Sequence, residues 1–203
     1  MLAAELQTHH SMNMPSFIAA YIGTCYQFTI QIPADTKYIF FSSPVVRTIG
    51  LMKKAGTAHT FRTNIEGTVE VYGFRDSPPQ ASGNVGFQLF DEYGNLTFDA
   101  GFMKPVNALT VPTTGVEVQP WPNAARQYAV GLGVYPKQCR GASQAGVPWG
   151  ILMSYCVRVG PNSGGGGLTA IASRPWGSAG GPAPGTTPLA SPPTAMTVDV
   201  TGR

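Results

Sequence analysis

The stretch Cys25-Tyr26-Gln27-Phe28-Thr29-Ile30-Gln31-Ile32-Pro33 decides the fold class of this chain. From Tyr26 to Ile32 every second side chain is apolar, and the side chains between them are polar. Because successive side chains of a β-strand point to opposite faces, this alternation predicts a strand with one apolar and one polar face. Antiparallel sheets can bury one face and leave the other in water. The stretch therefore predicts an antiparallel sheet.

The same alternation recurs along most of the chain. It occurs at Val69/Val71, Phe87/Leu89, Leu96/Phe98, Val116/Val118, Val130/Leu132/Val134, Ile151/Met153/Tyr155/Val157 and Met196/Val198/Val200. We predict an all-β fold with an antiparallel β-sandwich or barrel-like domain over residues 25–159. Only the first ~10 residues have a pattern compatible with a helix, and a helix of that length is marginal without tertiary support.

Two appendages are expected to flank this domain. Residues 1–24 are predicted to form an extended N-terminal arm, and residues 160–203 a Gly/Pro-rich connection that ends in a strand. The run Gly164–Gly167 is interpreted as a linker or a tight backbone crossing, because it lacks the Lys-Ser/Thr of a phosphate-binding loop. A composition so poor in large apolar side chains does not offset the entropy of ordering. We therefore expect residues 160–193 to be mobile unless neighbouring subunits hold them.

The composition favours a protein that is covered by neighbours. Only 11% of the 203 residues are charged, against about 25% in ordinary soluble domains, and the chain has 25 glycines and 18 prolines. The net charge of +3 is spread out, with Lys53-Lys54 as the only adjacent basic pair, so no nucleic-acid binding is predicted. No secretory signal is recognisable, and no apolar run approaches the ~18 residues that a membrane-spanning helix requires.

The sharpest local prediction is a hairpin between residues 86 and 99. Two short alternating runs flank Asp91-Glu92-Tyr93-Gly94-Asn95. Asp91 can accept hydrogen bonds from backbone amides, and Gly94 can adopt the positive φ that closes a type I turn with a bulge. Asp91 and Gly94 are therefore predicted to form the turn.

The polar residues do not form a recognisable catalytic or metal-binding set. His9-His10 and His59 lack neighbouring ligands at metal-binding spacing, and the chain has no G-x-S-x-G motif. Turn formation explains Asp91, and surface solubility explains Glu92 and Asp99 better than paired catalytic carboxylates do. The sequence predicts neither an enzyme nor a cofactor.

The three cysteines, Cys25, Cys139 and Cys156, are too few and too unevenly spaced for a disulfide framework. Cys139 and Cys156 flank a Pro- and Gly-rich turn and could face each other on neighbouring strands, which leaves open whether they pair. Two buried thiols are the favoured interpretation.

The three tryptophans, Trp121, Trp149 and Trp176, each adjoin proline or glycine. In such loops the indole can close the end of a sandwich and contact a neighbouring subunit, or it can stack on a sugar ring. We favour the packing role and predict these residues as interface anchors.

Two segments resemble a known family. Gly86-Phe-Gln-Leu-Phe, followed by Asp-Glu-Tyr-Gly-Asn-Leu-Thr-Phe-Asp99, resembles small β-rich tail proteins of tailed bacteriophages. Thr194-Ala-Met-Thr-Val-Asp-Val-Thr-Gly202 is similar to the way in which such proteins end. The resemblance implies a virion component without catalytic residues.

The sequence thus suggests a structural subunit of a bacteriophage virion, in the tail or tail tip, that is assembled in the host cytoplasm. Its expected partners are other copies of itself and other virion proteins. Two alternatives remain open: a module that binds carbohydrate on the host surface, and a head decoration or connector protein. Neither nucleic-acid binding nor membrane insertion is expected.

Overall fold

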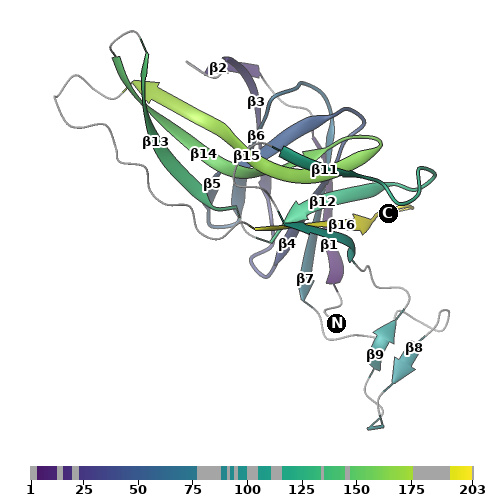
Figure 1. Cartoon of the computed structure of the whole chain (residues 1–203). Helices are drawn as coiled ribbons and strands as arrows, with labels where there is room; N and C mark the ends of the chain where they lie inside the picture. Colours follow the sequence, from purple (N-terminus) through teal and green to yellow (C-terminus); the bar gives the residue numbers. More distant parts are fainter. Residues whose placement is uncertain are drawn as a thin grey trace.

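The computed structural model describes residues 4–12, 16–19, 23–76, 88–90, 92–93, 96–99, 105–110, 116–133, 135–144, 147–175 and 193–202. All the regular secondary structure in these ranges is β-strand, and every strand pair is antiparallel. Two large sheets pack against each other as a β-sandwich (Figure 1). The predicted all-β, antiparallel fold class is confirmed.

The strands are distributed over two large sheets and one small sheet. The six-stranded sheet has the spatial order β1 (Ala4–Met12), β7 (Val69–Asp76), β4 (Tyr38–Ser42), β12 (Tyr128–Leu132), β16 (Thr194–Asp199) and β10 (Pro105–Thr110). The eight-stranded sheet has the order β11 (Val116–Pro120), β15 (Ser163–Pro175), β14 (Val147–Val159), β5 (Arg47–Ala55), β6 (Ala58–Thr63), β3 (Gly23–Gln31) and β2 (Ser16–Ala19), and β13 (Lys137–Gln144) also pairs with β14. The small sheet consists of β8 (Gln88–Phe90) and β9 (Leu96–Asp99).

Strand β3 has the alternation that its sequence predicts. Phe28 and Ile30 are buried, while Thr29 and Gln31 between and after them are exposed. Phe28 lies directly opposite Phe61 of β6, and their rings stack with centroids 5.4 Å apart. The period of two therefore sets both the buried face of the strand and its register with β6.

The main core lies between the two large sheets. Phe41 of β4 crosses from the six-stranded sheet and meets Phe61 edge to face at a centroid distance of 5.0 Å. Aliphatic side chains from both sheets surround these rings, including Ile49 and Val157 on one side and Val71 and Val130 on the other. Edge-to-face contacts of this kind add to the stabilisation that burial of the rings already provides.

The strands β4, β7, β12 and β16 of the six-stranded sheet have buried side chains on both faces, which differs from the predicted pattern of one dry and one wet face. On the face away from the main core, a second apolar cluster contains Phe40, Tyr72, Phe74, Ala129, Val198 and Val200. Strand β12 is consequently buried at all five of its positions. A strand with two dry faces contains apolar residues at consecutive positions, and the Ala129-Val130 pair has this pattern.

The N-terminal segment contains strands, although its first ~10 residues are the one stretch whose pattern is compatible with a helix. Residues Ala4–Met12 form β1, which pairs with β7, and β2 pairs with β3. A helix of about ten residues would have only its own hydrogen bonds, whereas a strand at the edge of β7 also gains partners from the sheet. Strands β1 and β2 are therefore the outermost described strands of the two large sheets.

The Gly/Pro-rich extension also contributes to the domain. Residues 163–175 form β15, which pairs with β14 on one side and with β11 on the other, so these residues belong to the eight-stranded sheet. Gly164–Gly167 are buried within this strand. A Cβ at Gly165 would overlap the carbonyl oxygen of Glu117, and one at Gly164 would overlap the ring of Trp121. The run is thus a tight backbone crossing, the second of its two predicted roles.

The predicted hairpin between residues 86 and 99 is present. Strands β8 and β9 pair antiparallel, and the register shifts between Leu89 and Phe90. Asp91 and Gly94, the predicted turn residues, lie outside the described residues, as do residues 176–192 of the extension.

The crossing at the glycine run leads to a first prediction. Gly165→Ala should lower the free energy of unfolding by about 2–3 kcal/mol, because the added methyl group meets backbone that cannot move aside as a side chain can. Gly133→Ala is the matched control, since nothing lies within 4 Å of a Cβ there. Denaturant unfolding of both variants measures the difference, and equal stability would contradict the close approach of β11 and β15.

Candidate functional site

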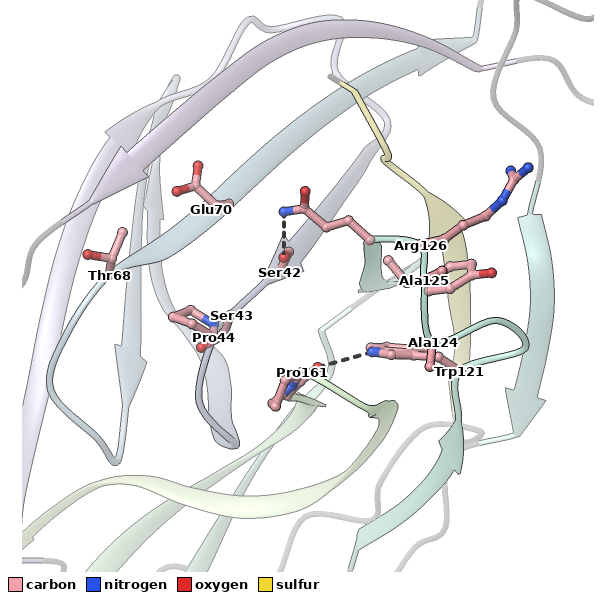
Figure 2. Close-up of a pocket in the computed structure, with 13 residues that line it drawn as sticks. Ser42, Ser43, Pro44, Thr68, Glu70, Trp121, Ala124, Ala125, Arg126 and Pro161 are labelled. Atoms are coloured by element: carbon pink, nitrogen blue, oxygen red, sulfur yellow. Dashed lines mark hydrogen bonds between the residues drawn. The ribbon is translucent and has the colours of Figure 1, made fainter.

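A pocket of about 470 Å³ opens at one end of the sandwich, where four segments meet (Figure 2). Ser42–Pro44 lie at the end of β4, Thr68 and Glu70 lie at the start of β7, and residues 121–128 connect β11 to β12. The turn between β14 and β15 adds Gly160 and Pro161. We call this region the loop-end pocket. Its volume lies within the usual range of small-molecule sites, about 300–1,000 Å³.

Arg47 binds the connection that leads to Thr68, a residue of the pocket lining. Its side chain is only 1% exposed, and its guanidinium donates hydrogen bonds to the backbone carbonyls of Ile65, Glu66 and Gly67 at 3.2–3.4 Å. Burial lowers the pKa of this guanidinium, although arginine remains charged in proteins. Arg47, the first residue of β5, therefore joins the start of that strand to the connection between β6 and β7.

Trp121 fixes the opposite wall. Its indole Nε1–H donates to the Gly160 carbonyl at 3.2 Å, and its backbone amide donates to the Asn162 carbonyl at 2.9 Å. Its ring packs at a tilt on Tyr128, with centroids 5.3 Å apart, and it also contacts the main core. The indole therefore packs within its own chain at the end of the sandwich, and its role as an interface anchor stays a prediction.

The loop between Trp121 and Tyr128 is tied down at several points. The Asn123 side chain accepts a hydrogen bond from the Ala125 backbone amide at 2.9 Å. The Gln127 backbone amide donates to Oγ1 of Thr201, also at 2.9 Å. The Gln127 carbonyl accepts the Val200 amide at 2.9 Å. These bonds anchor the base of the Gln127 side chain beside the pocket.

Most polar side chains of the loop-end pocket can both donate and accept hydrogen bonds, whereas the Glu70 carboxylate only accepts them. Its lining includes Ser42, Thr68, Glu70 and Gln127. The side-chain amide of Gln127 donates a hydrogen bond from Nε2 to Ser42 Oγ at 3.4 Å. The one cation on the lining, Arg126, forms an ion pair with Asp199. Burial by itself would raise the pKa of Asp199, but hydrogen bonds from Arg126 and Thr201 outweigh it and lower that pKa.

The other residues singled out from the sequence lie away from the loop-end pocket or are not described. Trp149 lies near the start of β14, opposite Ala142 of β13 and Pro175 of β15. Trp176, Asp91 and Gly94 fall outside the described residues. The described structure thus places Trp121 alone of these residues at the candidate site.

The histidines do not gather with other metal-binding side chains in the described part of the chain. His59 is buried, stacks on Phe61, and places its Nδ1 3.0 Å from the Thr57 carbonyl oxygen. His9 and His10 are consecutive residues of β1, opposite Tyr72 and Val71 of β7. The described residues contain no group of three histidine, cysteine or acidic side chains that could hold a metal ion.

Cys139 and Cys156 do not face each other across the sheet. The β13–β14 register sets Cys139 opposite Leu152, four residues along the strand from Cys156. The Cys156 thiol is free and buried, as the favoured interpretation predicts for this residue, and it donates to the Gly167 carbonyl at 3.1 Å. Burial raises the pKa of this thiol to about 12, so it stays protonated near neutral pH.

Apolar side chains are exposed at two places in the described part of the chain. On β11, the outermost described strand of the eight-stranded sheet, Val116 and Val118 are 40% and 41% exposed. Beside the loop-end pocket, Val45, Val46 and Ile65 are exposed at the turns that Arg47 joins. Alternation predicted the strand that contains Val116 and Val118, but it also suggested that their side chains would be buried.

Comparison with protein-family models, curated proteins and solved structures finds no match to this chain. The described residues contain no helix long and apolar enough to cross a membrane. The resemblance to phage tail proteins therefore stays a prediction.

A second prediction concerns Arg47. Arg47→Met should lower the free energy of unfolding by about 2–3 kcal/mol, because hydrogen bonds from a charged donor contribute about 1.5–3 kcal/mol and three carbonyls lose their partner. Arg75→Met is the control, since Arg75 forms a surface ion pair with Asp35, a class worth about 0–1 kcal/mol. The unfolding midpoints of both variants, measured by thermal unfolding, test this expectation. An unchanged midpoint for Arg47→Met would show that Arg47 does not hold these turns.

A third prediction concerns the reactivity of Cys156. In the native protein at about pH 8 this thiol should resist iodoacetamide, because only the thiolate reacts and burial keeps the thiol protonated. After unfolding in denaturant it should be alkylated readily. Peptide mass spectrometry reads both states, and rapid alkylation of the native protein would contradict the buried position.

Proposed function

We propose that this chain is a non-catalytic structural subunit of a tailed bacteriophage particle, a component of the tail or tail tip that acts through contacts with its neighbours. The observation that carries the proposal is the exposed edge at β11. A strand at the end of a sheet can offer backbone donors and acceptors to another chain, and apolar side chains beside them add affinity.

Strand β11 has few of the features with which proteins protect an edge. It contains no lysine or arginine, its only charged residue is Glu117, and its proline is at the last position. On its inner side it is held close to β15 by the glycine crossing, so the strand is fixed in place. A strand from a neighbouring subunit, either another copy or a different virion protein, could extend the sheet there.

The surface composition supports an assembled state. Only 11% of the residues are charged, and the described exposed apolar residues lie at β11 and at the turns that contain Val45, Val46 and Ile65, apart from Tyr93 in the β8–β9 turn. Burying such residues against a neighbour is favourable by about 25 cal/mol per Å² of apolar surface. The same features suit a head decoration or connector protein, so the position within the particle needs a direct measurement.

The fourth prediction tests the edge. Val118→Lys should prevent incorporation of the chain into particles, because a lysine on an edge strand opposes pairing with another strand. Val118→Thr is the matched control, since it keeps the branched shape that suits a strand. Both variants should unfold within about 0.5 kcal/mol of the original chain, because the site is exposed.

The readout is mass spectrometry of purified virions from infected cells that supply each variant, followed by locating the chain in the particle by electron cryomicroscopy. Density in the tail supports the proposal, and density in the head would support the decoration or connector alternative. Absence of the original chain from virions, or equal incorporation of both variants, would refute the edge mechanism.

A further inference from the structure

The loop-end pocket has polar groups that core packing does not require. Ser42 is only 6% exposed, yet the hydrogen bond that it accepts from Gln127 is 3.4 Å long, beyond the usual range of about 2.7–3.2 Å. Figure 2 shows Ser42 and Thr68 around an open space, with Glu70 at its rim. A buried hydroxyl with one long hydrogen bond has capacity left for a ligand.

From this arrangement we infer that the loop-end pocket binds a neutral, hydroxyl-rich ligand, namely a sugar unit. The Gln127 amide both donates and accepts, and the Glu70 carboxylate accepts. Each hydroxyl of a sugar donates one hydrogen bond and accepts others, so adjacent hydroxyls complement an amide and a carboxylate on the lining of one pocket. This inference goes beyond the proposed role in assembly and does not depend on it.

Two other ligand classes fit the pocket less well. An anion such as phosphate would meet the negative charge of Glu70, while the Arg126 guanidinium is already paired with Asp199. A purely apolar ligand would remove water from Ser42 and Gln127 without replacing their hydrogen bonds, which is costly. A hydroxyl-rich ligand avoids both penalties.

In this proposal Trp121 does not stack on the sugar ring, as a tryptophan often does in sugar-binding sites, but forms part of the pocket lining. Its indole N–H is used by the Gly160 carbonyl, and its ring is held between Tyr128 and the glycines of β15. The ring therefore forms a fixed wall. Recognition falls to Gln127, Ser42 and Glu70, none of which the sequence singled out.

The pocket is held open before any ligand arrives. Arg47 donates a hydrogen bond to the Gly67 carbonyl, next to Thr68. The Gln127 backbone amide donates to Thr201 Oγ1, and the Gln127 carbonyl accepts from the Val200 amide. A site whose walls are already ordered loses little conformational entropy on binding, so weak individual hydrogen bonds can give measurable affinity.

The test uses the full chain, labelled with ¹⁵N, and titrations with glucose, galactose, N-acetylglucosamine and rhamnose followed by NMR. At least one sugar should shift the Trp121 indole N–H and the Gln127 side-chain signals and reach saturation. Gln127→Ala should weaken binding about fivefold or more, since one neutral hydrogen bond is worth about that factor. Gln31→Ala is the matched control, because Gln31 accepts a hydrogen bond from Thr57 elsewhere on the same domain.

Thermal unfolding establishes that each variant is folded, and Ser42→Ala provides a second variant if Gln127→Ala is not. The inference is overturned if no sugar shifts these signals, if folded Gln127→Ala binds as the original chain does, or if inorganic phosphate saturates the same signals. A second arm uses immobilised bacterial polysaccharides. Binding there assigns the site to surface glycans, and binding of free sugars alone assigns it to small solutes. Because the isolated protein is used, absence of the chain from virions would leave this result unaffected.

Discussion

The contact between Phe41 and Phe61 is the interaction on which the rest of the structure depends, because it joins the two sheets at the centre of the core. Phe61 also stacks on Phe28, so three rings from β3, β4 and β6 form one unit. Aliphatic side chains from both sheets pack around these rings and complete the core. Once these rings meet, the ends of the two sheets lie next to each other, and the connections between strands can converge on one pocket.

The glycine run and Arg47 then determine the shape of that end. Glycine at position 165 lets the backbone of β11 approach β15, which brings the following residue, Trp121, over the turn at Gly160. The Arg47 guanidinium donates hydrogen bonds to three backbone carbonyls of the connection between β6 and β7, which precedes Thr68 on the pocket lining. The loop-end pocket is therefore a consequence of backbone geometry, and its side chains come from four separate segments of the chain.

The proposed edge for assembly and the inferred ligand site are neighbours in the sequence as well as in space. Strand β11 leads directly into the loop that contains Trp121 and Gln127. A partner strand that pairs with β11 would lie close to the pocket, so occupancy of one site has a physical route to affect the other.

The sequence by itself determined the fold class, the strand β3, and the pairing of β8 with β9, because period-two alternation acts over a few neighbouring residues. It also singled out Trp121, which lies on the lining of the loop-end pocket. Only the tertiary structure decided that residues 4–12 are a strand, since β7 supplies the hydrogen-bond partners, and that Gly164–Gly167 are a crossing, since β11 approaches there. Arg47, Ser42, Glu70 and Gln127 carry no local signal, because each acquires its role from residues that are distant in the chain. Long-range contacts of this kind leave no pattern in neighbouring residues, whereas the alternation of a strand does.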